Sequence, residues 1–168
     1  MMLVVVSDTH GRDDHRLAGR TRDAVETAEL VVHAGDFTTE RVLDAFREVA
    51  ASVRGVHGNR DEQGVRDRLP PALTLSYGGV RIAVTHRRRG GDTGLRMFGR
   101  ERGAEVVAHG HTHQPRVTDA GAVTLLNPGS HASPRGAPPA HAELEAGENG
   151  LVGRLVTVDG DVLESFDC

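Results

Sequence analysis

The chain has 168 residues, of which 38% are hydrophobic and 26% charged, and its formal net charge is −4. This length and composition predict one globular domain over residues 1–168 with a substantial core, while the negative charge argues against nonspecific nucleic-acid binding. No apolar run approaches the roughly 18 residues of a membrane helix, and Met1–Val6 lacks the basic start and cleavage site of a signal peptide, so we expect a cytoplasmic protein without membrane contact.

The front half alternates apolar runs with helical patterns, which predicts an α/β fold. Strands are expected at Leu3–Val6, Leu30–His33 and Ser52–Val56, with helices over Asp13–Ala28 and from an N-cap at Thr38 or Thr39 through Val49. The runs Leu73–Tyr77 and Val80–Thr85 flank Gly78-Gly79, a pattern typical of a hairpin. A helix near Thr93–Arg102 and a buried strand at Val106–Ala108 follow.

The back half changes pattern and predicts mostly antiparallel strands separated by Gly- or Pro-rich turns. The expected strands are Arg116-Val117, Ala122–Leu126, His141–Leu144, Leu151–Val158 and Val162–Phe166. Asp159-Gly160 predicts a tight hairpin turn between the last two strands, and Ser133–Pro139 predicts a mobile surface loop.

Five polar clusters each follow one of the apolar runs. They are Asp8-Thr9-His10-Gly11, Gly35-Asp36, Gly58-Asn59-Arg60-Asp61, His86, and His109-Gly110-His111-Thr112-His113. Because ligands of α/β sheets gather outside the carboxyl ends of strands, we expect these clusters to converge in one cleft. The only cysteine is Cys168, so a metal there depends on His, Asp and Asn, which suit Mn, Fe, Ni, Zn or Co.

The order and type of these clusters resemble the signature of the calcineurin-like metallophosphoesterases, and most of all their small single-domain bacterial and archaeal phosphodiesterases. The resemblance covers Leu3 to about Ser130 and includes Asn127-Pro128-Gly129-Ser130, which we expect to be a structural turn. It implies a four-layer α/β/β/α sandwich with two mixed β-sheets. It also implies hydrolysis of a phosphate ester by attack of a hydroxide that bridges two metal ions.

The resemblance assigns a role to each matching residue. Asp8, His10 and His113 are implied for the first divalent ion, and Asn59, His86 and His111 for the second. Asp36 is implied to bridge the two ions, and Asp61 to orient a ligand or its backbone turn. We expect Mn first, with Ni, Fe, Zn and Co as alternatives.

The sequence departs from its relatives at two places. Arg60 stands where many relatives have His, and an arginine can hold a phosphate oxygen but cannot donate a proton near neutral pH. Arg87-Arg88-Arg89 follows His86 where relatives often continue with Gly-His. We therefore expect Arg60, Arg87 and Arg88 to bind substrate phosphate, while a solvated loop is the alternative for Arg87–Arg89.

The favoured function is a phosphodiesterase acting on a small phosphate ester, with a homodimer or higher homo-oligomer as an expected assembly. A nuclease on DNA or RNA is one alternative, although it needs an extended basic groove. A non-catalytic scaffold that retains the fold is another, although such a protein is expected to lose ligands. His33, His57 and His109 precede ligand clusters, and we expect them to be packed or exposed at strand ends.

Overall fold

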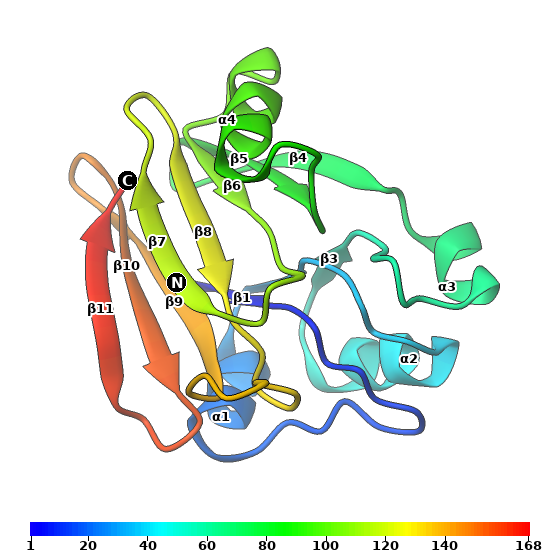
Figure 1. The fold of residues 1–168 in the computed structure, drawn as a ribbon. Helices are drawn as coiled ribbons and strands as arrows, with labels where there is room; N and C mark the ends of the chain where they lie inside the picture. The colour runs from blue at the N-terminus through cyan, green and yellow to red at the C-terminus, as the bar shows by residue number, and fades with distance from the viewer.

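The apolar runs of the sequence form two β-sheets in the computed structural model, which describes residues 1–168 (Figure 1). In the first sheet the order is β11 (Val162–Asp167), β10 (Gly150–Thr157), β9 (Ala140–Gly147), β1 (Met2–Val6), β2 (Leu30–His33) and β3 (Val53–Gly55). In the second sheet it is β4 (Ala72–Tyr77), β5 (Val80–Thr85), β6 (Val106–Ala108), β8 (Thr124–Pro128) and β7 (Pro115–Asp119).

Each sheet combines a parallel centre with antiparallel partners. Strands β1, β2 and β3 run parallel, while β9, β10 and β11 join them in antiparallel pairs. In the second sheet β5, β6 and β8 run parallel, and β4 and β7 form antiparallel edges. The prediction of two mixed sheets is therefore confirmed, as is the Gly78-Gly79 hairpin between β4 and β5.

Helices cover the outer faces of the two sheets. They are α1 (Gly19–Thr27), α2 (Glu40–Val49), α3 (Gln63–Arg68) and α4 (Gly91–Glu101). The side chains of α1 and α2 pack on the first sheet, and those of α4 pack on the second. This arrangement confirms the four-layer α/β/β/α sandwich. No helix of the structure is long and apolar enough to span a membrane.

Strand β1 shows why its sequence is apolar without alternation. Leu3 and Val5 lie in the cluster of 15 buried residues between the sheets, whereas Val4 and Val6 lie in the cluster of 14 beneath α1 and α2. Successive side chains of a strand point to opposite faces, and here both faces are covered. Complete burial of such a side chain stabilises the fold by about 1.5–3 kcal/mol.

Two helices differ from the predictions. The helix expected over Asp13–Ala28 begins only at Gly19, because Arg16 has a φ of 54° and the Leu17 N–H donates to Nδ1 of His15 rather than to a helical carbonyl. Helix α3 was not predicted, since six residues are too few to show helical periodicity. The alternative of Thr39 as N-cap of α2 is confirmed, because its Oγ1 accepts from Val42 N at 3.4 Å.

A buried charge network ties α1 to the first sheet. The Glu143 carboxylate is 2% exposed and accepts hydrogen bonds from Arg20 at 2.7 and 2.9 Å and from Arg154 at 3.0 Å. His141 lies 3.0 Å from the same carboxylate. Burial alone raises the pKa of Glu143, but the hydrogen bonds with His141 and Arg20 outweigh it and lower the pKa to about 2.

Candidate metal centre

The loops that follow five parallel strands carry the predicted metal ligands to one edge of the sandwich. Asp8 and His10 follow β1, Asp36 follows β2, Asn59 follows β3, His86 follows β5, and His111 and His113 follow β6. The carboxyl ends of parallel strands lie on the same side of each sheet, so five loops distant in sequence meet in space. The interactions described below link all seven side chains, although their role as ligands stays a prediction.

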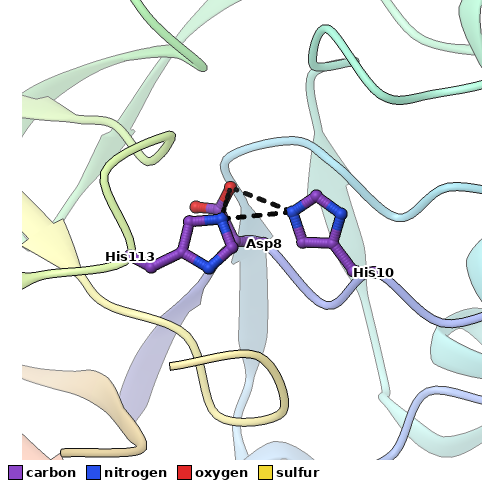
Figure 2. Close-up of side chains that lie close together, drawn as sticks. All are labelled: Asp8, His10 and His113. Carbon is purple, nitrogen blue, oxygen red and sulfur yellow. Dashed lines mark hydrogen bonds and ion pairs between the residues drawn. The ribbon is translucent and has the colours of Figure 1, made fainter. Parts of the chain in front are cut away.

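The first group of donors is Asp8, His10 and His113 (Figure 2). The Nε2 atoms of the two histidines lie 3.2 Å apart. Asp8 Oδ1 lies 3.6 Å from His10 Nε2 and 3.3 Å from His113 Nε2. Three donor atoms thus face one small volume, with the two imidazole rings stacked at a centroid separation of 4.9 Å.

The second group lies beside the first and shares Asp8 with it. Asp36 Oδ2 lies 3.2 Å from His86 Nε2 on this side and 3.5 Å from His10 Nε2 on the other. Asp36 therefore stands between the two groups, where a bridging ligand has to be. His111 Nδ1 lies 3.0 Å from Asn59 Oδ1, and the His111 ring lies 5.4 Å from the His86 ring.

The backbone of these loops is held in an unusual conformation. Asp8, His10, Asp36, His111 and His113 all have φ between 46° and 75°, a region that residues other than glycine rarely adopt. Such strain persists only where the surroundings enforce it, and it concentrates at functional sites. Backbone hydrogen bonds supply part of that enforcement, from Asp8 N to Gly35 O at 2.9 Å and from His10 N to Asp36 O at 3.1 Å.

Two glycines allow the loops to approach each other closely. A Cβ on Gly58 would lie 2.1 Å from Asp36 Oδ1, and a Cβ on Gly110 would lie 2.0 Å from Ser7 Oγ and 2.5 Å from Asp8 Oδ2. Any side chain at either position would displace a predicted ligand. Their place beside the ligand clusters therefore reflects close contact across the site.

The hydrogen bonds of two histidines orient their free nitrogens toward the centre. His86 Nδ1 donates to the Ala34 carbonyl at 2.8 Å, and His113 Nδ1 donates to the carbonyl of Ser133. Because a carbonyl only accepts, Nε2 of each ring carries the lone pair that a metal ion requires. Asp8 Oδ1 and His86 Nε2 are buried without a hydrogen-bond partner. Two buried polar atoms without hydrogen bonds suit the role of ligands to a cation in the centre.

Charges within the centre favour ionised carboxylates beside the histidines. Burial raises the pKa of Asp8, but His10, His113 and His86 outweigh it, and the pKa falls far below its usual range. Burial likewise opposes ionisation of Asp36, whose pKa is lowered by His86. Burial depresses the pKa of His86, yet Asp36 and Asp8 raise it overall. The two carboxylates are thus held in their ionised form by the neighbouring histidines.

Asp61 is buried beside the predicted ligands and binds the backbone of two ligand-bearing loops. Its carboxylate is 4% exposed, and it accepts backbone N–H bonds from Asp36 at 3.1 Å, Thr38 at 2.6 Å and Gly58 at 2.7 Å. These bonds occupy both oxygens and connect the turns that carry Asp36 and Gly58. Arg60 is exposed, and its N–H donates to Asp36 Oδ1 at 2.8 Å.

Three residues for which the sequence predicted only a structural role support the centre. His33 is fully buried, lies 2.9 Å from Thr9 Oγ1 through Nε2, and accepts from Gly35 N at 3.1 Å through Nδ1, so it links the β1 and β2 loops. Ser130 donates to the Asp8 carbonyl at 2.7 Å. Asn127 donates to the Gly110 carbonyl at 3.2 Å. Their polarity inside buried strand ends was the available signal.

The chain matches known proteins over most of its length. The sequence pattern of the calcineurin-like phosphoesterase superfamily domain matches residues 1–147. A probable metallophosphoesterase of Methanocaldococcus jannaschii is 36% identical over 140 residues, which are 80% of this chain and 70% of that protein. A probable metallophosphoesterase of Methanothermobacter thermautotrophicus is 33% identical over 172 residues, covering 99% of this chain and 98% of that protein.

Two further comparisons concern activity and fold. A phosphodiesterase of Methanocaldococcus jannaschii is 25% identical over 145 residues, which are 77% of this chain and 83% of that protein. The crystal structure of wild-type Vps29 from Entamoeba histolytica, complexed with Zn²⁺, superposes with a TM-score of 0.77 at 27% identity, covering 99% of both chains. The two-sheet sandwich is therefore shared along the whole chain.

Proposed function

Because the chain belongs to the calcineurin-like phosphoesterase superfamily, we propose that it is a phosphodiesterase that uses two divalent metal ions to hydrolyse a small phosphate ester. One observation carries the proposal. Asp8 Oδ1 and His86 Nε2 are buried without a hydrogen-bond partner, and Asp36 Oδ2 lies 3.5 Å from His10 Nε2 and 3.2 Å from His86 Nε2. This pattern suits two cations that share one carboxylate.

The donor set divides between the two proposed ions. Asp8, His10 and His113 would hold the first, Asn59, His86 and His111 would hold the second, and Asp36 would contact both. Bound there, two divalent ions supply a hydroxide nucleophile at neutral pH and neutralise the charge of the phosphate. Mn is the first choice, and mixed imidazole and oxygen donors also accept Ni, Fe, Zn and Co.

The chain's own residues orient these donors and provide further positive charge. Ala34 and Ser133 carbonyls fix the His86 and His113 rings, and Asp61 fixes the turn that carries Asp36. The Arg60 backbone N–H donates to Asp36 Oδ1, so Arg60 is attached to the centre through its backbone while its side chain is exposed. We propose that the Arg60 guanidinium binds a phosphate oxygen, and that water protonates the leaving group where protonation is needed.

The proposal is tested with bis-p-nitrophenyl phosphate and p-nitrophenyl phosphate in the presence of Mn²⁺. We expect the wild type to hydrolyse the diester faster, and Asp36→Asn to lose more than about 100-fold in kcat/KM, because even the partners of metal ligands contribute about 10–100-fold. Asp67→Asn removes an exposed carboxylate on α3 and is the matched control. Metal binding without turnover of either ester would favour the scaffold alternative.

The role of Arg60 has its own test. Arg60→Ala is expected to lower kcat/KM for the diester by about 10-fold or more, since a charge-assisted bond to phosphate is lost. If Arg60→Ala kept the kcat and KM of the wild type, Arg60 would have no part in the proposed reaction.

Salt-sensitive cleavage of oligonucleotides, faster than that of the small diester, would favour the nuclease alternative. Cytoplasmic location and homo-oligomer formation stay predictions.

A further inference from the structure

A basic hollow lies beside the candidate metal centre. It has a volume of about 780 Å³ and is lined by Arg87, Arg88, Arg89, Met97, Phe98 and the predicted ligand His111, among others. Arg87 and Arg88 also line a second hollow that contains the predicted ligands Asn59 and His86. Arg87, Arg88 and Arg89 therefore form an arginine ridge beside the metal centre, and its first two members line both hollows.

The arginines of this ridge are free to bind a ligand. Arg87, Arg88 and Arg89 are exposed, and none forms an ion pair or a side-chain hydrogen bond within the chain. The Arg88 guanidinium lies over the ring of Phe98, 4.1 Å from its centroid, so α4 holds it at the wall of the hollow. By contrast, Arg116 on β7 is paired with Asp92 at 2.9 Å.

Three unpaired guanidinium groups exceed what one phosphate requires. In the proposed function, the scissile phosphate is neutralised by two divalent ions and Arg60. The charge of the ridge then faces another part of the substrate, and guanidinium groups match phosphate oxygens in a bidentate geometry. Helix α4 bounds the hollow and places the acidic Glu101 on its lining. The chain as a whole has a net charge of −4. Both negative contributions disfavour a long polyanion and suit a small phosphorylated ligand better.

We propose, as an extension of the proposed function, that Arg87–Arg89 bind a second phosphate of the substrate. The preferred substrate is then a small phosphodiester that carries a further phosphate group, as a nucleoside bisphosphate ester does. The metal centre hydrolyses the diester bond, while the ridge selects for the additional charge. Specificity in this chain therefore comes from the segment between β5 and α4, where it departs from its relatives.

Two chromogenic esters that differ only in the second phosphate test this proposal. Thymidine 5′-(p-nitrophenyl phosphate) and its 3′-phosphorylated form release the same p-nitrophenolate from the same diester. At constant ionic strength with Mn²⁺, we expect the wild type to show a KM about 10-fold lower for the 3′-phosphorylated ester, with similar kcat, because a charge-assisted bond is gained in substrate binding. Equal KM values would overturn the proposal.

Variants of the ridge locate the effect. Arg87→Gln/Arg88→Gln is expected to bring the ratio of the two KM values close to one. Arg87→Gln alone keeps the contact of Arg88 with Phe98 and is expected to reduce the ratio in part. Arg96→Gln/Arg100→Gln removes two exposed charges from α4 outside the lining and is expected to keep the ratio. An unchanged ratio in the ridge variants would place the selectivity elsewhere.

Binding without turnover separates this proposal from the proposed function. Calorimetry compares thymidine 3′,5′-bisphosphate with thymidine 5′-phosphate, and we expect the bisphosphate to bind about 10-fold more tightly to the wild type only. This preference without hydrolysis of either ester would overturn the catalytic function and keep the subsite. Tighter binding of an oligothymidylate than of the bisphosphate would instead overturn the small substrate.

Discussion

Replacement of Asp61 by Asn tests whether the backbone behind the metal centre depends on one carboxylate. Asp61 Oδ2 accepts from Asp36 N at 3.1 Å and Gly58 N at 2.7 Å, while Oδ1 accepts from Thr38 N at 2.6 Å. Asparagine has the same shape but only one acceptor oxygen. If that oxygen occupies the Oδ2 position, the amide group meets the Thr38 N–H, and two donors face each other.

The magnitude follows from these bonds. A hydrogen bond to a charged group contributes about 1.5–3 kcal/mol, and a buried donor without a partner costs about 1–3 kcal/mol. We therefore expect Asp61→Asn to lower the free energy of unfolding by about 2–4 kcal/mol, and Asp61→Ala by more. Because Asp36 sits on the affected turn with a φ of 62°, affinity for Mn²⁺ should also fall, by about 10–100-fold.

Urea denaturation in EDTA, followed by circular dichroism, measures the first effect, and calorimetric titration with Mn²⁺ measures the second. Asp67→Asn is the matched control, because Asp67 is exposed and accepts only from Gln63 Nε2 at 2.6 Å. Its effect should stay within about 0.5 kcal/mol. If Asp61→Asn and Asp67→Asn had the same midpoint, slope and Mn²⁺ affinity, the three bonds would not support the centre and the reasoning would be refuted.

Three further predictions concern metal, packing and pH. Mn²⁺ at about 100 times its dissociation constant should stabilise the wild type by about 2.7 kcal/mol and raise Tm by about 5–10 °C, and Asp8→Asn should lose this shift in a thermal scan. His33→Phe leaves Thr9 Oγ1 and the Gly35 N–H without their partner, so metal affinity should fall about 10-fold or more and stability by about 1–3 kcal/mol. The pKa of Glu143 is about 2 in the folded chain and 4.5 in its reference state, so its ionised form stabilises the fold above pH 4.5. This contribution, about 3 kcal/mol, is lost as the pH falls toward 2, and Glu143→Gln should lack that part of the pH dependence in urea titrations.

Specific outcomes would contradict each of these. An equal Tm shift in Asp8→Asn would mean that Mn²⁺ binds elsewhere. Unchanged affinity in His33→Phe would show that the two ligand loops hold their geometry without that link. Parallel stability curves for wild type and Glu143→Gln between pH 5 and pH 2, measured in EDTA, would show that Glu143 is not perturbed by its partners.

Much of the fold was predictable because local patterns determined it. The run Leu3–Val6 is apolar on both faces, which a strand buried between two layers requires. Gly78, Gly79 and Gly160 supply the positive φ values that tight hairpin turns need. The prediction that the first helix begins at Asp13 was wrong, because a single left-handed residue, Arg16, interrupts the helical pattern before α1. Helix α3 escaped detection because its six residues, of which only Val65 is buried, are too few to show helical periodicity.

The sequence by itself placed five polar clusters after apolar runs, which predicted one cleft at the strand ends, and the family resemblance then implied which seven residues are the candidate metal donors. It also identified Arg87 and Arg88 as a departure from the family pattern. Only the tertiary structure decided that His33 and Ser130 support those donors and which backbone groups Asp61 binds, since these contacts join backbone and side-chain groups of different loops. It likewise placed the arginine ridge beside the metal centre. Contacts of this kind depend on how the two sheets stack, and the hydrophobic pattern of a single segment does not predict that stacking.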